Sequence, residues 1–406
     1  MIRIFFTLFF TSQCLFSDVE ISGHVDFNAQ AYVLTDSSKY KNAFTAKQTL
    51  ALEYTNENVT LFTKVYAQEA YHDFFGQKDE TQRSFVRLDE LYVTIENDES
   101  TIEIGKSIKF WGSLELRNIV DVFNPNDLRN DMFVNDKLGV WNVSYAYYTE
   151  NGEIALILKG TEQKQRMAGE SYAYYFFSQP LRYDAHLQTT QSKKRPTAYL
   201  KWSGSTQSDT PIDYAFIYQN GYDSQRYFSI IANQTLAQHV YRVNKFMTYN
   251  TLVIGATLIK LEALYAFVEE NTNVGDYSHL GLGVEHTFNT FKSGAGIGLI
   301  GEYYRYDTYD TDKFDDVQLF ETMQNDLFIG VRYTLNDEDD SSFIGGIVHD
   351  LEYDEQTFYV KYESRLQESF KVEIDYFYIE PSKNTQTAYS YLGRHQRVGV
   401  NIAYHF

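Results

Sequence analysis

The feature that most constrains this chain is a two-residue alternation that extends to its last residue. In the run VEISGHVDFNAQAYV, residues 19–33, apolar side chains alternate with polar or charged ones. Neighbouring side chains on a strand point to opposite faces, so the run predicts a strand with one apolar and one wet face. It exceeds the usual length of soluble strands and suits a tilted membrane crossing. The same pattern returns in residues 370–378 and in 398–406, which end in Phe406.

The composition favours a transmembrane barrel over several soluble domains. Aromatic residues make up 17% of the chain, with 35 Tyr and 30 Phe, whereas Pro numbers only 5. Aromatic girdles and half-polar strands are typical of outer-membrane barrels. After the N-terminus, no apolar run approaches the roughly 20 residues that a membrane helix needs. We therefore predict an all-β fold, a transmembrane antiparallel β-barrel.

The alternation predicts about eighteen strands, with sixteen as the alternative, because boundaries are weakly determined. An even number lets the sheet close without an exposed edge. Connections after odd strands are mostly long, and we expect them to be external: 72–83, 111–137, 161–195, 221–238, 307–322 and 381–393. Connections after even strands are short, and we expect them to be periplasmic turns: Thr55–Asn56, Asn97–Asp98, Glu150, 205–210, Leu258, 289–292, 336–340 and 367–369. Two connections fit poorly, since the external one at 353–354 is very short and Leu258 carries no turn chemistry.

The N-terminus predicts export. Residues 1–17 combine one basic residue, Arg3, with an apolar core and end at Ser17, which outlines a secretory signal peptide. The barrel domain would then be residues 18–406. Cys14 raises a lipoprotein alternative. It is the only cysteine and lies in this leader, so we expect no disulfide in the mature chain.

The alternation stops in the connection 111–137, where aromatic, charged and turn-forming residues crowd together. A segment of this kind in a β-patterned chain is uncommon unless it is functional. The sequence FNPND predicts a turn, because Pro125 fixes φ and Asn124 can bond to nearby backbone. Trp111 and Phe123 would anchor the segment by burying apolar area against the wall.

Charged residues lie within and beside this segment. Arg117 and Arg129 are expected to meet carboxylates such as Glu90, Asp121 or Asp127. On one reading these charges only hold the loop in place. On the other they line a constriction and set ion selectivity, as charged rings do in pores. The candidate constriction residues are Arg87, Glu90, Lys109, Arg117, Asp121, Asp127 and Arg129.

Several of these pieces resemble a family of outer-membrane barrel proteins of porin or exporter type. They are Arg87 and Glu90 in RLDELY, Gly105–Lys106, Trp111–Gly112, and Asp121 followed by FNPND. The resemblance implies that 111–137, the third external loop, folds back into the barrel and narrows it. The terminal Phe406 resembles the aromatic end that outer-membrane barrels use as an assembly signal. This implies contact with the assembly machinery and with outer-membrane lipid or lipopolysaccharide.

Other function classes are disfavoured. The formal charge of −20 argues against nucleic acid, which is bound by clustered Lys and Arg. Neither Gly-x-Ser-x-Gly nor His-Glu-x-x-His occurs, and the adjacent His349 and Asp350 would point to opposite faces of a strand. The acidic run Asp307–Asp316 lacks the glycine-bearing pattern of calcium loops. We expect neither an enzyme nor a cofactor or metal.

The sequence thus predicts a porin in the outer membrane of a Gram-negative bacterium, a passive diffusion channel for small hydrophilic solutes and ions. One alternative is a substrate-specific uptake or export channel, for example for an anionic polymer. Another is a plugged barrel that acts as a surface adhesin or binding protein. A homo-oligomer is left open, because the sequence does not single out a flat apolar wall patch.

Overall fold

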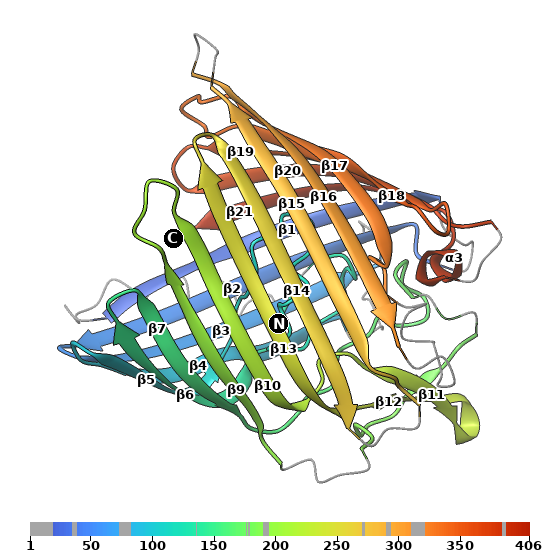
Figure 1. Cartoon of the computed structure of the whole chain (residues 1–406). Helices are drawn as coiled ribbons and strands as arrows, with labels where there is room; N and C mark the ends of the chain where they lie inside the picture. Colours follow the sequence, from blue (N-terminus) through green and yellow to red (C-terminus); the bar gives the residue numbers. More distant parts are fainter. Residues whose placement is uncertain are drawn as a thin grey trace.

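The computed structural model describes residues 19–34, 39–72, 83–134, 136–175, 177, 179–189, 195–269, 273–289, 294–309, 321–383 and 387–406. An 18-stranded antiparallel sheet runs through this part of the chain, each strand pairing with the next along the sequence (Figure 1). The last strand pairs with the first, so the sheet closes into a barrel. The predicted leader lies outside the described residues and stays a prediction.

The first nine barrel strands are β1 (Val19–Leu34), β2 (Asn42–Asn56), β3 (Val59–Tyr71), β4 (Phe85–Glu96), β5 (Ser100–Ser107), β6 (Val140–Thr149), β7 (Gly152–Lys159), β9 (Thr197–Ser205) and β10 (Ile212–Tyr222). The other nine are β13 (Arg242–Ile254), β14 (Thr257–Glu269), β15 (Tyr277–Phe288), β16 (Gly296–Thr308), β17 (Asn325–Thr334), β18 (Ser342–Asp350), β19 (Gln356–Leu366), β20 (Phe370–Glu380) and β21 (His395–His405). The predicted eighteen-stranded barrel is confirmed, with long connections at one end and tight turns at the other. We call these the loop end and the turn end.

Three predicted connections were misplaced. Thr55 and Asn56 lie inside β2, and the turn that follows is Glu57–Asn58, where Glu57 has a positive φ of 51°. Leu258 lies inside β14, and the turn before it is Gly255–Ala256, where Gly255 adopts the left-handed φ of 58°. The connection placed at 353–354 is longer, because β18 ends at Asp350 and β19 begins at Gln356. Its Asp354 also has a positive φ, 57°, which marks a tight turn.

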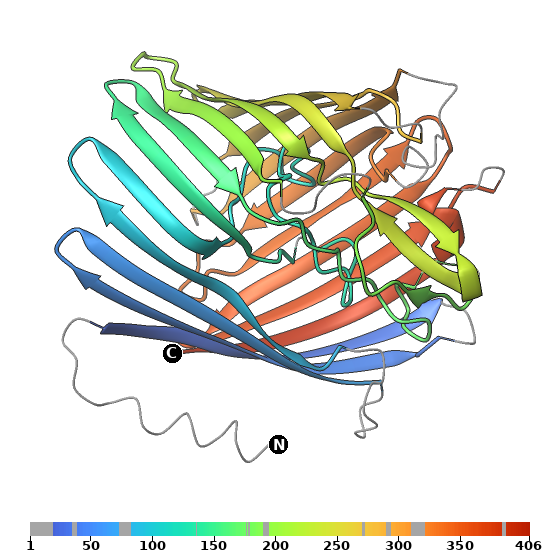
Figure 2. The same cartoon turned by 90° about the horizontal axis from the view of Figure 1, so that it is seen from below.

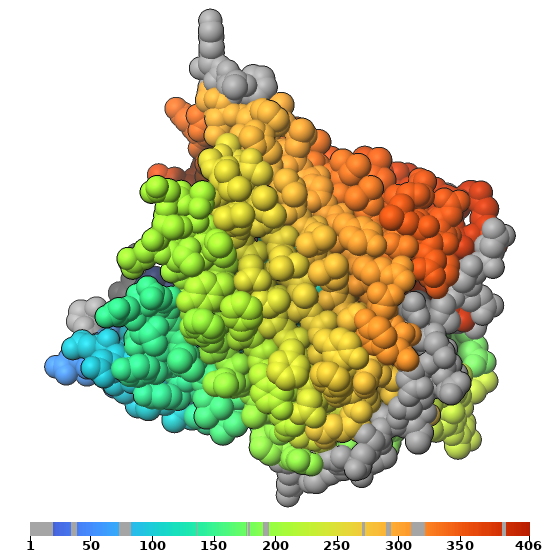
Figure 3. All heavy atoms as spheres, in the orientation of Figure 1, coloured from blue at the N-terminus to red at the C-terminus, as the bar shows by residue number. Residues whose placement is uncertain are grey.

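The alternation in the sequence separates a lumenal face from an outer face. In β1, the ring of Phe27 lies on the outside and the residue is 49% exposed, whereas Asp26 and Asn28 point into the lumen. Outward-facing apolar side chains recur around the wall. Figure 3 shows one face of that wall, on which the green, yellow and orange strands lie side by side. An apolar outer surface is what a strand facing lipid requires. Among the described residues, no helix is both long and apolar enough to cross a membrane.

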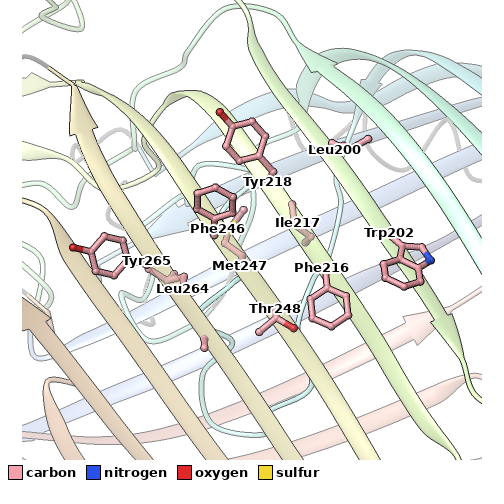
Figure 4. A pocket seen from close by; sticks show the side chains of 11 residues that line it. Leu200, Trp202, Phe216, Ile217, Tyr218, Phe246, Met247, Thr248, Leu264 and Tyr265 are labelled. Carbon is pink, nitrogen blue, oxygen red and sulfur yellow. The ribbon is translucent and has the colours of Figure 1, made fainter.

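The outer wall has a hollow over β9, β10, β13 and β14 (Figure 4). It is centred where small side chains, Thr248 and Ala263, face each other across β13 and β14. Larger rings, including Trp202, Phe216 and Phe246, surround these small residues, so the hollow is strongly apolar.

The seam of the barrel joins the two ends of the described chain. β1 and β21 pair in antiparallel register from His24 with His405 onward. Two further backbone hydrogen bonds of 3.0 Å link Gly23 and Phe406. The ring of Phe406 lies directly over Gly23, and a Cβ added there would come within 2.8 Å of it.

The loop end carries structure that the alternation did not predict. A second, three-stranded sheet consists of β8 (Arg182–Tyr183), β11 (Tyr227–Ile231) and β12 (Thr235–His239), with the 3-10 turn η2 (Ala232–Gln234) between the last two. A short helix, α3 (Ala388–Leu392), precedes β21 and begins with a capping box at Thr387. These elements extend the wall beyond the barrel strands (Figure 1).

Candidate constriction inside the barrel

The connection between β5 and β6 runs through the inside of the barrel (Figure 2). We call this segment, residues 108–139, loop L3. It starts where β5 ends at Ser107, earlier than the alternation had suggested, and so includes Lys109. Its apolar residues Leu114, Val120 and Phe123 are buried, at 5%, 0% and 0% exposure. L3 is therefore a packed element of the lumen.

An aromatic cluster anchors L3 to the wall at β9, on the side of the barrel nearer to its own strands. The rings of Trp111 and Phe123 lie 5.5 Å apart, and each lies within 5.4 Å of Tyr199 on β9. These separations are typical of favourable aromatic pairs. Burying each of the two loop rings stabilises the packed position by roughly 1.5–3 kcal/mol. The structure thus places Trp111 and Phe123 against Tyr199 of the wall.

The neck of L3 is closed by Asn124. Its side-chain amide donates to the carbonyl oxygens of Ser107 at 3.0 Å and Leu138 at 2.9 Å, and its oxygen accepts from the amide of Lys109 at 2.8 Å. Beside it, the carbonyl of Pro125 accepts from the Leu138 amide at 2.8 Å. One side chain thereby ties the outgoing and returning arms of the loop together.

The far side of L3 is held by a carboxylate on β14. Glu262 is fully buried and accepts the backbone amides of Ser113 at 2.5 Å, Leu114 at 3.0 Å and Val120 at 3.2 Å. Each such hydrogen bond contributes about 0.5–1.5 kcal/mol net. Glu262 thus fixes both ends of the tip of the loop, residues 113–120.

A second carboxylate, on β16, continues the same arrangement. Glu302 accepts the amides of Glu115 at 2.6 Å and Leu116 at 3.0 Å, and it accepts the Tyr304 hydroxyl at 2.7 Å. The Tyr304 oxygen in turn accepts the amide of Arg117 at 3.1 Å. The tip of L3 therefore crosses the lumen and is held by the wall opposite its own strands.

Two glycines on β15 make room for the tip. The side chain of Leu114 lies on the bare backbone of Gly281 and Gly283. A Cβ at Gly281 would overlap Leu114, and one at Gly283 would lie 2.9 Å from it. Because β15 lies between β14 and β16, these glycines form a shallow seat between the two carboxylates.

A bulge in β4 brings Arg87 and Glu90 to the same face. Lys64 pairs with Glu90 and Val65 with Leu88, so Asp89 has no partner in the register. Without the extra residue, positions 87 and 90 would point to opposite faces, because side chains alternate. In the lumen, Glu90 forms an ion pair with Lys64 at 3.5 Å.

Arg87 and Arg129 are bound by carboxylates of the returning arm. Arg87 meets Asp127 at 2.6 Å and Asp136 at 3.0 Å, and it also binds Asp89. Arg129 forms a two-pronged contact with Asp127, at 2.5 and 2.8 Å. Asp127 itself is completely buried. Burial raises the pKa of Asp136, and the neighbouring Arg87 opposes that rise only in part.

The other candidate charges pair as follows. Arg117 contacts Glu321 and donates to Thr322 at 3.0 Å, in place of the carboxylates expected from the sequence. Lys109 forms an ion pair with Glu103 of β5 at 3.0 Å.

The charge at Asp121 is neutralised inside the loop. Asp121 binds Lys137 and accepts the Trp111 amide at 3.1 Å. Both side chains of the Asp121–Lys137 pair are almost fully buried. This pair therefore stabilises the loop internally and does not face the lumen.

The returning arm of L3 also touches the wall on its other side. Asp131 binds Arg397 of β21, which contacts Asp375 of β20 at 2.7 Å. The Arg397 guanidinium donates to the hydroxyl of Tyr174, from the connection after β7, at 2.6 Å. Asn130 donates to Gln68 of β3 at 2.9 Å. The returning arm of L3 thus joins β3 and β21 on the other side of the barrel.

Sequence reasoning missed the wall residues that hold L3. Glu262, Glu302 and Arg397 are charged residues on the polar face of strands, which was a readable signal of lumenal position. Nothing in their spacing, however, indicated which loop they would meet. The run Asp307–Asp316 falls mostly outside the described residues, and the described part of the chain contains no group of three or more His, Cys, Asp or Glu placed to hold a metal ion.

Comparison with known proteins bears on the fold. Neither a protein-family model nor a curated protein sequence matches the chain. Solved structures do. Acinetobacter baumannii OccAB4 aligns over 96% of this chain and 98% of its own, with a TM-score of 0.56 and 9% identity. The chain has the fold of a porin.

Two further neighbours give the same result. A BenF-like porin from Pseudomonas fluorescens Pf-5 aligns over 97% of this chain and 100% of its own, with a TM-score of 0.56 and 8% identity. Pseudomonas aeruginosa OpdQ aligns over 96% and 99%, with a TM-score of 0.56 and 10% identity. These alignments establish a shared architecture. Because the identities are so low, the roles of the lumenal residues must be argued from this chain alone.

Proposed function

We propose that this protein is an outer-membrane porin, a passive diffusion channel for small hydrophilic solutes and ions. The observation that carries the proposal is the way L3 is held inside a closed barrel. Glu262 and Glu302 bind its tip from the opposite wall, so the loop is a permanent part of the lumen. A loop held this way narrows a channel by a fixed amount, and neither a cofactor nor a reaction step is needed.

The mechanism is partition by size and charge. On this proposal, solutes enter the polar lumen and pass through a gap between L3 and the wall. Half-exposed charged groups face that gap, among them Glu115 of the loop and Arg332 of β17, which form an ion pair at 2.7 Å. In narrow, partly desolvated surroundings such charges act on passing ions more strongly than they would in bulk water.

The same proposal places the chain in the outer membrane of a Gram-negative bacterium. The apolar outer wall and the expected leader, residues 1–17, support that location. The expected role of Phe406 as an assembly signal gains support from its position, because its ring covers Gly23 where the barrel closes. The assembly machinery would then read a residue that also completes the seam.

The testing experiment is single-channel recording of the refolded protein in planar bilayers. We expect stable open steps, and an ion preference, read from the reversal potential in a salt gradient, that changes in Arg117→Ala and Arg129→Ala. Silence from protein shown to be folded and inserted would overturn the porin proposal in favour of a binding barrel. Sharp block by one solute would instead indicate a dedicated channel.

A further inference from the structure

Lys47 is a lumenal cation at mid-height of the barrel that the constriction described above does not use. It lies on β2 between two lumenal neighbours, pairing with Asp26 of β1 and with Gln68 of β3. Gln68 contacts L3 through Asn130, at 2.9 Å, so Lys47 stands level with the returning arm of the loop. The residue is half-buried, and it shares the lumenal face of the sheet with Asp26 and Gln68.

The charges that surround Lys47 come from both sides of the gap. They are the carboxylates of Asp26 on the wall and of Asp136 and Asp131 on L3, together with the guanidinium of Arg83. Although these charged groups lie nearby, no hydrogen bond or ion pair joins the Lys47 ammonium to any residue in the described ranges. Its three N–H donors are therefore available to water or to a solute.

The neighbouring carboxylates are already occupied. Asp136 is bound by Arg87 at 3.0 Å, and Asp131 by Arg397. Asp26 contacts His24 at 3.2 Å and accepts weakly from Asn401 at 3.4 Å. In contrast, Arg87 and Arg397 donate to Asp136 and Asp131, and Arg83 donates to Asn130 at 3.1 Å. Lys47 is thus the cation at this level whose donors remain unused among the described residues.

We propose that Lys47 is the contact site for an anionic oxygen group, a carboxylate or a phosphate, on solutes that pass L3. A lysine ammonium is a compact point charge on a flexible stem, so it can follow such a group across the gap without a fixed geometry. The proposal rests on the proposed porin function, and it adds an oxyanion preference to a chain whose overall charge is strongly negative.

The test is block of potassium chloride current by inorganic phosphate and, separately, by acetate, in wild type and in Lys47→Met, Lys47→Arg and Lys371→Met. Met keeps the length of the side chain and removes the charge. Lys371 is the control, because it is lumenal but already paired with Glu363 at 3.2 Å and Glu373 at 3.0 Å. Heat-dependent migration in gels shows that each variant is folded.

We expect Lys47→Met to raise the half-blocking concentration about fivefold, which corresponds to about 1 kcal/mol for one water-screened charge contact. Lys47→Arg and Lys371→Met should behave as wild type does. A stronger effect with phosphate than with acetate identifies phosphate as the preferred source of the oxyanion, and the reverse identifies carboxylate. An unchanged half-blocking concentration in Lys47→Met, or a conducting wild type that neither anion blocks, overturns the site and leaves the porin intact. A folded wild type that does not conduct overturns the porin itself.

Discussion

Removing the two carboxylates that hold the tip of L3 should make the channel wider and noisier. Glu262 and Glu302 together accept five backbone amides of the loop. With both changed to alanine, each of the five amides loses its acceptor in the lumen. At a net value of about 1 kcal/mol per bond, the packed position loses about 5 kcal/mol. That is a change of more than a thousandfold in the ratio of packed to released loop.

The remaining contacts of L3 determine how far the loop is released when these hydrogen bonds are lost. Trp111, Phe123 and Leu114 remain buried and contribute roughly 1.5–3 kcal/mol each. We therefore expect each single variant to keep the loop packed, and the double variant Glu262→Ala with Glu302→Ala to release the tip for part of the time. The assay is single-channel recording, where release appears as larger mean conductance and excess open-channel noise.

Two controls separate loop release from loss of lumenal charge. Glu373→Ala removes a carboxylate of β20 that is paired with Lys371 at 3.0 Å, and its conductance should stay quiet. Glu262→Gln with Glu302→Gln keeps acceptor oxygens and should give a smaller effect than the alanine pair. A folded double alanine variant with wild-type conductance and noise would refute the reasoning, because it would show that the five bonds do not position the tip.

Three further predictions concern the same loop. Gly281→Ala should displace Leu114 from its position on β15 and lower the free energy of unfolding by about 1–3 kcal/mol. Gly301→Ala is the control and should be neutral, because there is open space around its Cβ position. Thermal unfolding in detergent compares the two variants. Trp111→Ala should cost about 3–5 kcal/mol in the same assay, and a loss under 1 kcal/mol would show that the aromatic cluster is not an anchor. Because the pKa of Asp136 is raised, this carboxylate should lose its charge before ordinary carboxylates do as pH falls. The anion-to-cation permeability ratio of the wild type should therefore begin to rise at a higher pH than that of Asp136→Asn. Identical pH profiles would contradict this.

The architecture was readable from the sequence because lipid and water impose their pattern residue by residue. Each crossing needs one apolar and one polar face, so the alternation predicted all eighteen strands of the barrel. It failed at Leu258, where β13 and β14 stay apolar through their turn. A glycine within an apolar run indicates a turn, and here Gly255 makes it with a left-handed φ of 58°.

The candidate site was predicted only in its local part. The neck formed by Asn124 and the packing of Trp111 near Phe123 depend on residues close in sequence. The partners of the tip lie far along the chain, for example 142 positions away for Val120 and Glu262 and 204 for Arg117 and Glu321. Their meeting depends on how the barrel curves, which no spacing in the sequence encodes. The bulge at Asp89 was hidden for a similar reason, since a single inserted residue leaves the composition of the strand unchanged.

The seam between β1 and β21 has a consequence for the order of folding. Most barrel strands pair with a neighbour a few residues away, so those hairpins can form as soon as both strands exist. The seam pairs His24 with His405, which lie at opposite ends of the barrel sequence. Closing so long a loop costs conformational entropy before the contact contributes any stability. Contacts of that separation are slow to form. The ring of Phe406 on Gly23 is therefore one of the last contacts expected to form, and until it does, the two edge strands remain open to pairing with another chain.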